Sequence, residues 1–168
     1  MQLLGTVPLE KLTPSRIWSA LDRESRSLAA RSLYAPGEEK ANREEANLAI
    51  ASALRFRIQA VRKLPMEKRV DYLVRAVHPD DSLASSLLTK LHLDHRTEML
   101  GAFLDSLEIP QNNGMIDENF ELEPVDATRL TAAASSLRER FPADEVEIYL
   151  ATLVAMDPEV WEGLATAP

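Results

Sequence analysis

Apolar residues recur along most of this chain at the three- and four-residue spacing of one helical face. The first run predicts a helix over residues 13–34, because Thr13-Pro14 combines a capping hydroxyl with a proline in the first turn. Ala35-Pro36-Gly37 ends this run, and the next run predicts a long second helix over residues 38–64. The apolar stripes of these two helices contain Ile17, Leu21 and Leu28, and then Ile50, Leu54, Ile58 and Val61.

The rest of the chain divides into shorter helices, each opened by a proline or by an aspartate that can cap free amides. These helices are predicted to begin at Pro65, at Asp80 or Asp81, at Asp94, at Asp126, at Pro142 and at Pro158. One long irregular connection is expected at about residues 108–125. Within it, residues 119–123 alternate enough to allow one short extended piece, and no other strand is expected.

These elements predict an all-α fold of a single domain, residues 1–168, in which about eight helices form consecutive antiparallel hairpins. We expect helix in more than about 55% of the residues. A proline followed seven residues later by Tyr-Leu occurs twice, at Pro65 to Leu73 and at Pro142 to Leu150. This recurrence indicates either a HEAT-like or internally duplicated arrangement or a chance repeat of helix punctuation, and the sequence leaves both open.

Charge is distributed unevenly along the chain, whose net charge is −8. Residues 1–76 contain 14 Lys and Arg against 9 Asp and Glu, a balance of +5, whereas residues 77–168 contain 5 against 18, a balance of −13. Such asymmetry points toward charged partners. The basic residues concentrate between positions 55 and 69, and the candidate interface consists of Arg55, Phe56, Arg62, Lys63, Lys68 and Arg69.

This basic segment allows three interpretations. Binding of a nucleic-acid backbone, with Phe56 stacking on a base, is disfavoured because Glu67 and Asp71 interrupt the cations and the sequence pI is about 4.9. The cations can instead offset the acidic half of their own chain. Alternatively, they dock on the acidic surface of a protein partner or of a second copy.

The three histidines fall within eighteen residues, at His78, His92 and His95. His92 and His95, with Glu98, form the one candidate metal site, because imidazole and carboxylate are ligands that zinc or iron accepts. However, Asp94 is predicted to cap a new helix, which would separate His92 from His95. Capping and surface roles are therefore expected for these histidines, and no metal or other cofactor is predicted.

Recognisable catalytic motifs are missing from the sequence. It contains no Gly-x-Ser-x-Gly elbow, phosphate-binding loop or dinucleotide fingerprint, and no Cys. The longest apolar stretch, residues 148–156, is too short to span a membrane, and the N-terminus does not resemble a secretory signal. We therefore expect a soluble cytoplasmic protein-interaction or scaffold module without catalysis of its own. The alternative is a metal-dependent enzyme or small-ligand binder that uses the region of His78, His92 and His95.

Overall fold

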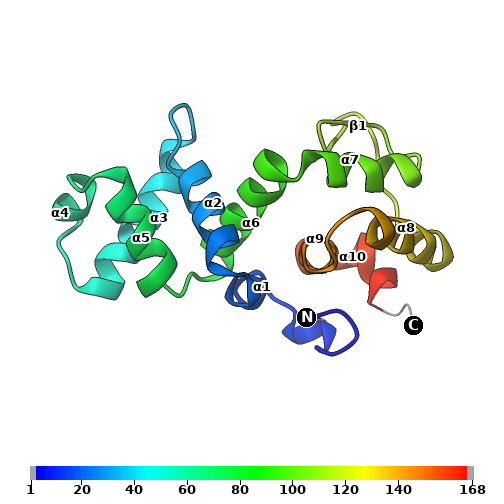
Figure 1. Ribbon diagram of the computed structural model, residues 1–168, viewed down its shortest axis with the longest axis horizontal. Coiled ribbons are helices and arrows are strands. Elements are labelled where there is room, and N and C mark those ends of the chain that lie inside the picture. The colour runs from blue at the N-terminus through cyan, green and yellow to red at the C-terminus, as the bar shows by residue number, and fades with distance from the viewer. Residues whose placement is uncertain (1–2, 166–168) are drawn as a thin grey trace.

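A computed structural model describes residues 3–165 of the chain, and helices dominate it (Figure 1). The α-helices in this described part are α1 (Pro14–Ala20), α2 (Arg23–Leu33), α3 (Lys40–Leu54), α4 (Ile58–Arg62), α5 (Met66–Ala76), α6 (Asp81–His95), α7 (Thr97–Ser106), α8 (Ala127–Arg140), α9 (Ala143–Met156) and α10 (Pro158–Trp161). Two short 3-10 helices, η1 (Leu9–Lys11) and η2 (Glu162–Leu164), lie near the two ends. With 69% of the chain helical, the predicted all-α class is confirmed.

The two longest predicted helices are each interrupted in the structure. The first is divided because Leu21 is extended and the Asp22 carboxylate accepts a hydrogen bond from the Ser25 amide at 2.7 Å, which caps α2. The second ends at Leu54, where Arg55 adopts the left-handed conformation with φ 55°. The apolar periodicity hid both breaks, because the segments on either side of each break pack into the same core.

The junction between α6 and α7 also differs from the prediction. Asp94 does not cap a helix; α6 continues through His95, and Arg96 alone separates it from α7. The predicted caps at Asp80 and Asp126 are correct, since their carboxylates accept hydrogen bonds from the amides of the following first turns. Leu91 and His92, in the last turns of α6, are both buried. This packing keeps the helix continuous past Asp94, so Asp94 does not serve as a cap.

α6 lies at the centre of the molecule (Figure 1). It packs against α1, α2 and α3 on the N-terminal side and against α7 and α9 on the C-terminal side. α3, α4 and α5 form one end of the molecule, and α7 to α10 form the other (Figure 1). Because α2 packs on α5 and α6, and α1 packs on α6 and α9, the contacts are not confined to consecutive hairpins. One cluster of buried apolar residues runs through both ends.

The N-terminal segment is attached to α9 by a buried carboxylate. Glu147 is 6% exposed, and one of its oxygens accepts hydrogen bonds from the backbone amides of Leu3 and Leu4, each at 2.7 Å. Hydrogen bonds to an ionised acceptor are stronger than those between neutral groups. These bonds join Glu147 to Leu3 and Leu4, which precede it by 144 and 143 positions. The sequence pattern does not reveal this contact.

The irregular connection contains a small hairpin of β1 (Gln111–Asn112) and β2 (Met115–Ile116), paired antiparallel. Asn113 and Gly114 form its turn, both with positive φ, as expected for an Asn-Gly pair. A Cβ at Gly114 would lie 2.7 Å from Leu100 Cβ, so glycine allows the hairpin to approach α7. The predicted extended piece at residues 119–123 is not a strand; the strands precede it.

The two Pro-to-Tyr-Leu segments share some but not all of their structural features. Pro65 and Pro142 each precede a helix, and Leu73 and Leu150 are both completely buried. Tyr149 is also buried, whereas Tyr72 is half-buried. The recurrence therefore reflects similar packing of one leucine, and the duplication stays a prediction.

Candidate functional site

The structure does not bring the three histidines together. His92 is buried, and its Nε2 lies 3.1 Å from Thr152 Oγ1 of α9. His95, one turn later on the same helix, turns instead toward α2, where its Nε2 lies 2.7 Å from Ser32 Oγ. His78 is exposed in the connection between α5 and α6.

The alternative metal site of His92, His95 and Glu98 is therefore not assembled. Within residues 3–165, no group of three or more His, Asp or Glu side chains is placed to hold a metal ion. Continuity of α6 through His95 removes the separation that a cap at Asp94 would impose, yet the two rings still contact different helices.

The environment of His92 keeps its ring neutral. Burial lowers the pKa of His92 to about 3, and the positive charge of Arg96 adds to this effect. Thr152 donates its hydroxyl hydrogen to the Ile148 carbonyl at 2.7 Å, so the His92 Nε2–H is left as the donor to Thr152. Tyr149 packs edge-on against the same ring, with centroids 5.4 Å apart. His92 is thus a structural group between α6 and α9.

Ser32 and His95 have the separation of a nucleophile and its base, but not the surroundings. Ser32 lies inside α2 and is 8% exposed, so a substrate has little access to its hydroxyl. Backbone amides within a helix are already engaged with carbonyls one turn earlier and do not form an oxyanion hole. This hydrogen bond serves to fasten α6 to α2.

The six residues of the sequence-predicted interface take different positions. Arg62 and Arg69 line one pocket, whereas Lys63 and Lys68 are exposed and are not part of its lining. Arg55 is exposed at the end of α3. Phe56 is 43% exposed, and its ring contacts that of Tyr72 edge-on, with centroids 6.0 Å apart.

The pocket that contains Arg62 and Arg69 has a volume of about 540 Å³ and is formed by parts of four helices. Ligand pockets in proteins usually measure about 300–1,000 Å³. Seven residues line it: Tyr34 at the end of α2, Lys40, Arg43, Glu44 and Asn47 of α3, Arg62 of α4 and Arg69 of α5. Four of these side chains are cationic and one is anionic. We call this site the basic pocket.

At its floor, Arg69 is held by an aromatic ring and an amide. The Arg69 guanidinium lies over the Tyr34 ring, 4.7 Å from the centroid, a distance typical of a cation–π contact. Asn47 Oδ1 accepts hydrogen bonds from Tyr34 Oη at 2.9 Å and from Arg69 Nη1 at 3.4 Å. Burial raises the pKa of Tyr34 to about 12, so its hydroxyl remains a neutral donor at physiological pH.

Glu44 partly neutralises the pocket. Arg62 donates hydrogen bonds from Nε and Nη2 to Glu44, with Nε 2.9 Å from Oε1. The pKa of Glu44 is lowered, first by these hydrogen bonds from Arg62 and then by Asn47 and the charges of Arg62 and Lys40. The carboxylate is therefore ionised at neutral pH, and it forms an ion pair with one of the four cations, Arg62.

Lys40 and Arg43 complete the basic pocket from the first turns of α3. Within residues 3–165, neither side chain forms an ion pair or a hydrogen bond. Both are remote in sequence from the predicted interface. Lys40, Arg43, Glu44 and Asn47 follow the three- and four-residue spacing of one helical face, so the helix periodicity could have grouped them with one another. That Arg62 and Arg69 line the same pocket could be learned only from the fold.

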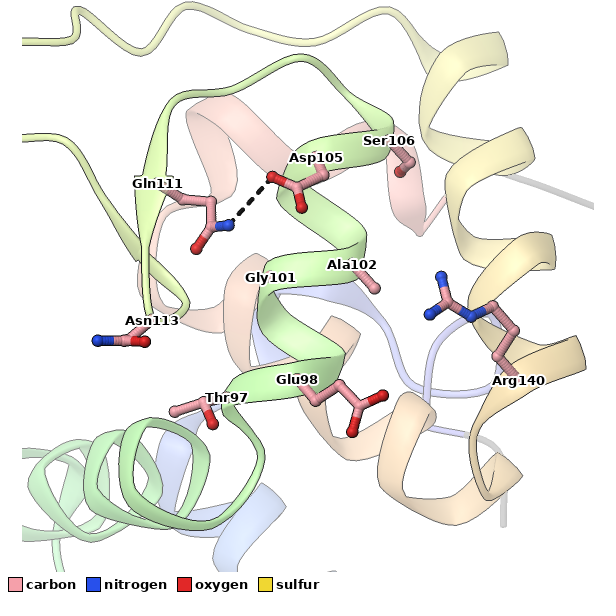
Figure 2. A pocket seen from close by; sticks show the side chains of 9 residues that line it. All are labelled: Thr97, Glu98, Gly101, Ala102, Asp105, Ser106, Gln111, Asn113 and Arg140. Atoms are coloured by element: carbon pink, nitrogen blue, oxygen red, sulfur yellow. Dashed lines mark hydrogen bonds between the residues drawn. The ribbon is translucent and has the colours of Figure 1, made fainter.

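A second depression, of about 670 Å³, lies along the exposed face of α7. Figure 2 shows Arg140 extending from α8 toward α7, while Gln111 reaches from the hairpin to Asp105, with Nε2 and Oδ1 3.0 Å apart. Its lining includes the carboxylates of Glu98 and Asp105 besides Arg140. The two acids and one arginine of this groove nearly balance, whereas the basic pocket has four cations against one carboxylate, so the basic pocket is the better candidate.

Comparison of the chain with models of known protein families, with curated proteins and with solved structures finds no match. The functional assignment therefore rests on the geometry and charge of the site alone. Every helix in the described residues falls short of the length and apolarity required to cross a membrane.

Proposed function

We propose that this chain is a non-catalytic protein-interaction module that binds an acidic segment of a partner protein in the basic pocket. The observation that carries the proposal is the gathering of four cations and one carboxylate around one concavity, in a chain whose net charge is −8. Complementary charge speeds encounter with a partner and excludes partners of the same sign. The absence of Cys fits a reducing compartment, and we expect the partner in the cytoplasm.

The ion pairs favour a partner over neutralisation by the acidic half of the same chain. The cations of the N-terminal half pair locally: Arg31 with Glu67, Arg62 with Glu44, and Arg23 and Arg75 with Asp71. Among residues 3–165, no Lys or Arg from the first 76 positions forms a direct ion pair with an acid from the later positions. The excess positive charge of the first 76 residues is thus available to bind another molecule.

The shape of the site favours a short acidic segment over a nucleic acid. A nucleic-acid backbone requires cations spaced along a track, usually with free aromatic platforms. Here Arg62 and Arg69 converge with Lys40 and Arg43 on one pocket, and Phe56 packs against Tyr72. A second copy of the chain offers acidic surface too, and its binding would appear as self-association.

The test is a titration of a fluorescein-labelled peptide of alternating Glu and Ser, followed by fluorescence anisotropy. Lys40→Gln with Arg43→Gln removes two pocket cations that have no recorded ion pair, so folding should be nearly unchanged. Lys11→Gln with Arg16→Gln is the matched control, since it removes the same charge at exposed positions outside the pocket. We expect the pocket variant to bind at least about tenfold more weakly than wild type and the control to stay within about twofold.

Added salt should weaken binding, because the Debye length shrinks from about 8 Å at physiological ionic strength to about 3 Å at 1 M. An equal loss in both double variants would mean that overall charge, not the pocket, attracts the peptide. Absence of binding to the wild type would also reject the proposal. Sedimentation of the wild type shows whether a second copy is the partner.

A further inference from the structure

We propose that the acidic group which enters the basic pocket is a phosphate monoester on the partner, the side chain of a phosphoserine or phosphothreonine. This inference rests on the proposed function and specifies its ligand. Three observations carry it: the number of cations without a carboxylate partner, the way Arg69 is held, and the position of Glu44.

The charge of the pocket exceeds what one carboxylate can neutralise. With Arg62 engaged by Glu44, the cations of Lys40, Arg43 and Arg69 remain without a carboxylate in contact among residues 3–165. A carboxylate side chain brings one negative charge, whereas a phosphate monoester brings about 1.5 to 2 at neutral pH, together with three strong acceptor oxygens. The monoester is therefore the better match for three cations in one site.

The Arg69 guanidinium is positioned but not saturated. A guanidinium has five N–H donors, and Asn47 Oδ1, at 3.4 Å, is the acceptor recorded for it in the described residues. Its Nε is buried, and no residue of the described part of the chain accepts a hydrogen bond from it. The contact with the Tyr34 ring restrains the group, which lowers the ordering that binding requires. Such a fixed fork suits the paired oxygens of a phosphate.

The donors also reach the pocket from different elements. Lys40 and Arg43 come from the start of α3, and Arg69 comes from α5. The amino-terminal end of α3 adds a favourable dipole, and the residue before it, Glu39, makes no side-chain capping bond. Donors that approach from separate helices suit a tetrahedral group with three terminal oxygens better than a planar carboxylate.

Glu44 makes the pocket selective for a strongly charged ligand. An incoming anion meets the repulsion of this carboxylate and must compete with it for Arg62. A phosphate monoester, with more charge and more acceptors, competes better than a single carboxylate. Removal of this competitor by Glu44→Gln should therefore strengthen phosphopeptide binding severalfold.

The experiment compares three peptides of otherwise identical sequence that contain phosphoserine, Ser or Glu at one position, titrated by isothermal calorimetry. We expect the phosphoserine peptide to bind wild type at least about tenfold more tightly than the Glu peptide. Its advantage should diminish between pH 7.5 and 5.5, because the second phosphate pKa is about 6. Inorganic phosphate should displace the phosphopeptide.

Two variants distinguish a loss of contacts with the ligand from a loss of folding. Arg69→Lys keeps the positive charge but removes the forked guanidinium. The affinity of this variant for the phosphopeptide should fall close to its affinity for the Glu peptide. Because Arg69 packs on Tyr34, its variant is checked by circular dichroism and thermal melting. Arg43→Gln provides the second reading, since the Arg43 side chain forms no ion pair or hydrogen bond within residues 3–165. We expect Arg43→Gln to weaken the phosphopeptide more than the Glu peptide.

The outcomes separate the two proposals. Equal affinity for the Glu and phosphoserine peptides would reject the phosphate inference and leave the acidic-segment function standing. Failure of both to bind would reject both proposals. Tighter binding of a single-stranded oligonucleotide than of the phosphopeptide would overturn the monoester in favour of phosphodiesters.

Discussion

At the scale of single residues, His92 shows how far a side chain can depart from the role its type suggests. Among the three histidines it is the most buried, and its ring nitrogen Nδ1 has no hydrogen-bond partner within residues 3–165. Burial and the nearby Arg96 hold the pKa of His92 at about 3, compared with about 6.5 for an exposed histidine. The clustering of histidines along the sequence suggested a metal site, but burial determines what this one does.

The pKa of His92 predicts a pH-dependent stability. The folded-state pKa lies below the unfolded value, so between pH 6.5 and 3 the unfolded chain binds a proton that the folded chain does not. The free energy of unfolding should therefore fall as the pH decreases through this window, by up to about 1.4 kcal/mol per pH unit from this group. Above pH 6.5 this contribution should fade, and by about pH 7.5 the residue should add almost no pH dependence.

His92→Gln provides the control, because glutamine keeps a donor for Thr152 but does not titrate. Urea unfolding of both proteins at pH 7.5 and pH 5 should show about 2 kcal/mol less loss in the variant. The difference between the proteins removes the contribution of carboxylates, which titrate in both. Parallel losses would show that His92 titrates in the folded chain much as it does in the unfolded one.

At the scale of elements, the sequence predicted the existence of helices better than their limits. Prolines and capping aspartates marked several helix starts correctly, because their effect is local: a side-chain oxygen or a missing N–H acts within one turn. Asp22 and Asp94 show the limit. Asp22 was placed inside a helix and caps one, whereas Asp94 was expected to cap a helix and lies inside one. Whether an aspartate caps a helix or lies inside one depends on which neighbouring residues are buried, and burial is set by the tertiary packing.

The repeated Tyr-Leu pair gives a test of the element packing. Leu73 of α5 and Leu150 of α9 are both fully buried. Truncation of a buried leucine to alanine removes transfer free energy and leaves a cavity, so Leu73→Ala and Leu150→Ala should each lower the free energy of unfolding by about 2 to 5 kcal/mol. Chemical denaturation measures both changes.

Leu48→Ala is the matched control on α3, since Leu48 is 54% exposed and should cost far less. A loss below about 0.5 kcal/mol for Leu73→Ala or Leu150→Ala would mean that the helix concerned presents a different face to the core. Large effects at both positions would agree with the packing and would not decide whether the segments arose by duplication.

At the scale of the whole molecule, the sequence revealed an asymmetry of charge but not the place where charge converges. Arg62 and Arg69 were recognised because they lie in a dense basic segment. Lys40 and Arg43 were missed, because they lie in a mixed run with several glutamates around them. Helix α3 brings them to the same pocket only by packing against α4 and α5. Local density of charge along a chain is therefore a poor guide to which cations share a site.

The fold also bears on the proposed docking site, because the basic pocket lies at one end of the molecule (Figure 1). α3, α4 and α5 form the end remote from α7 to α10 (Figure 1). Most of the acidic residues belong to the later part of the chain, and the acids nearest to Lys40 and Arg43 in sequence are Glu38, Glu39, Glu44 and Glu45. The cost of holding like charges together is reduced by Glu44 and by the Tyr34 ring.

The measurement that tests the central claim most directly is a titration of the ¹⁵N-labelled protein with the acidic peptide, followed by backbone and arginine side-chain NMR shifts. The account predicts that the largest changes fall on Tyr34, on residues 40–47, and on the side chains of Arg62 and Arg69. It also predicts that residues along α7 and α8 stay unchanged and that, in the variant Lys40→Gln with Arg43→Gln, the shifts saturate at a peptide concentration at least about tenfold higher. Saturable changes centred on α7 and α8, with the basic pocket unaffected, would contradict it.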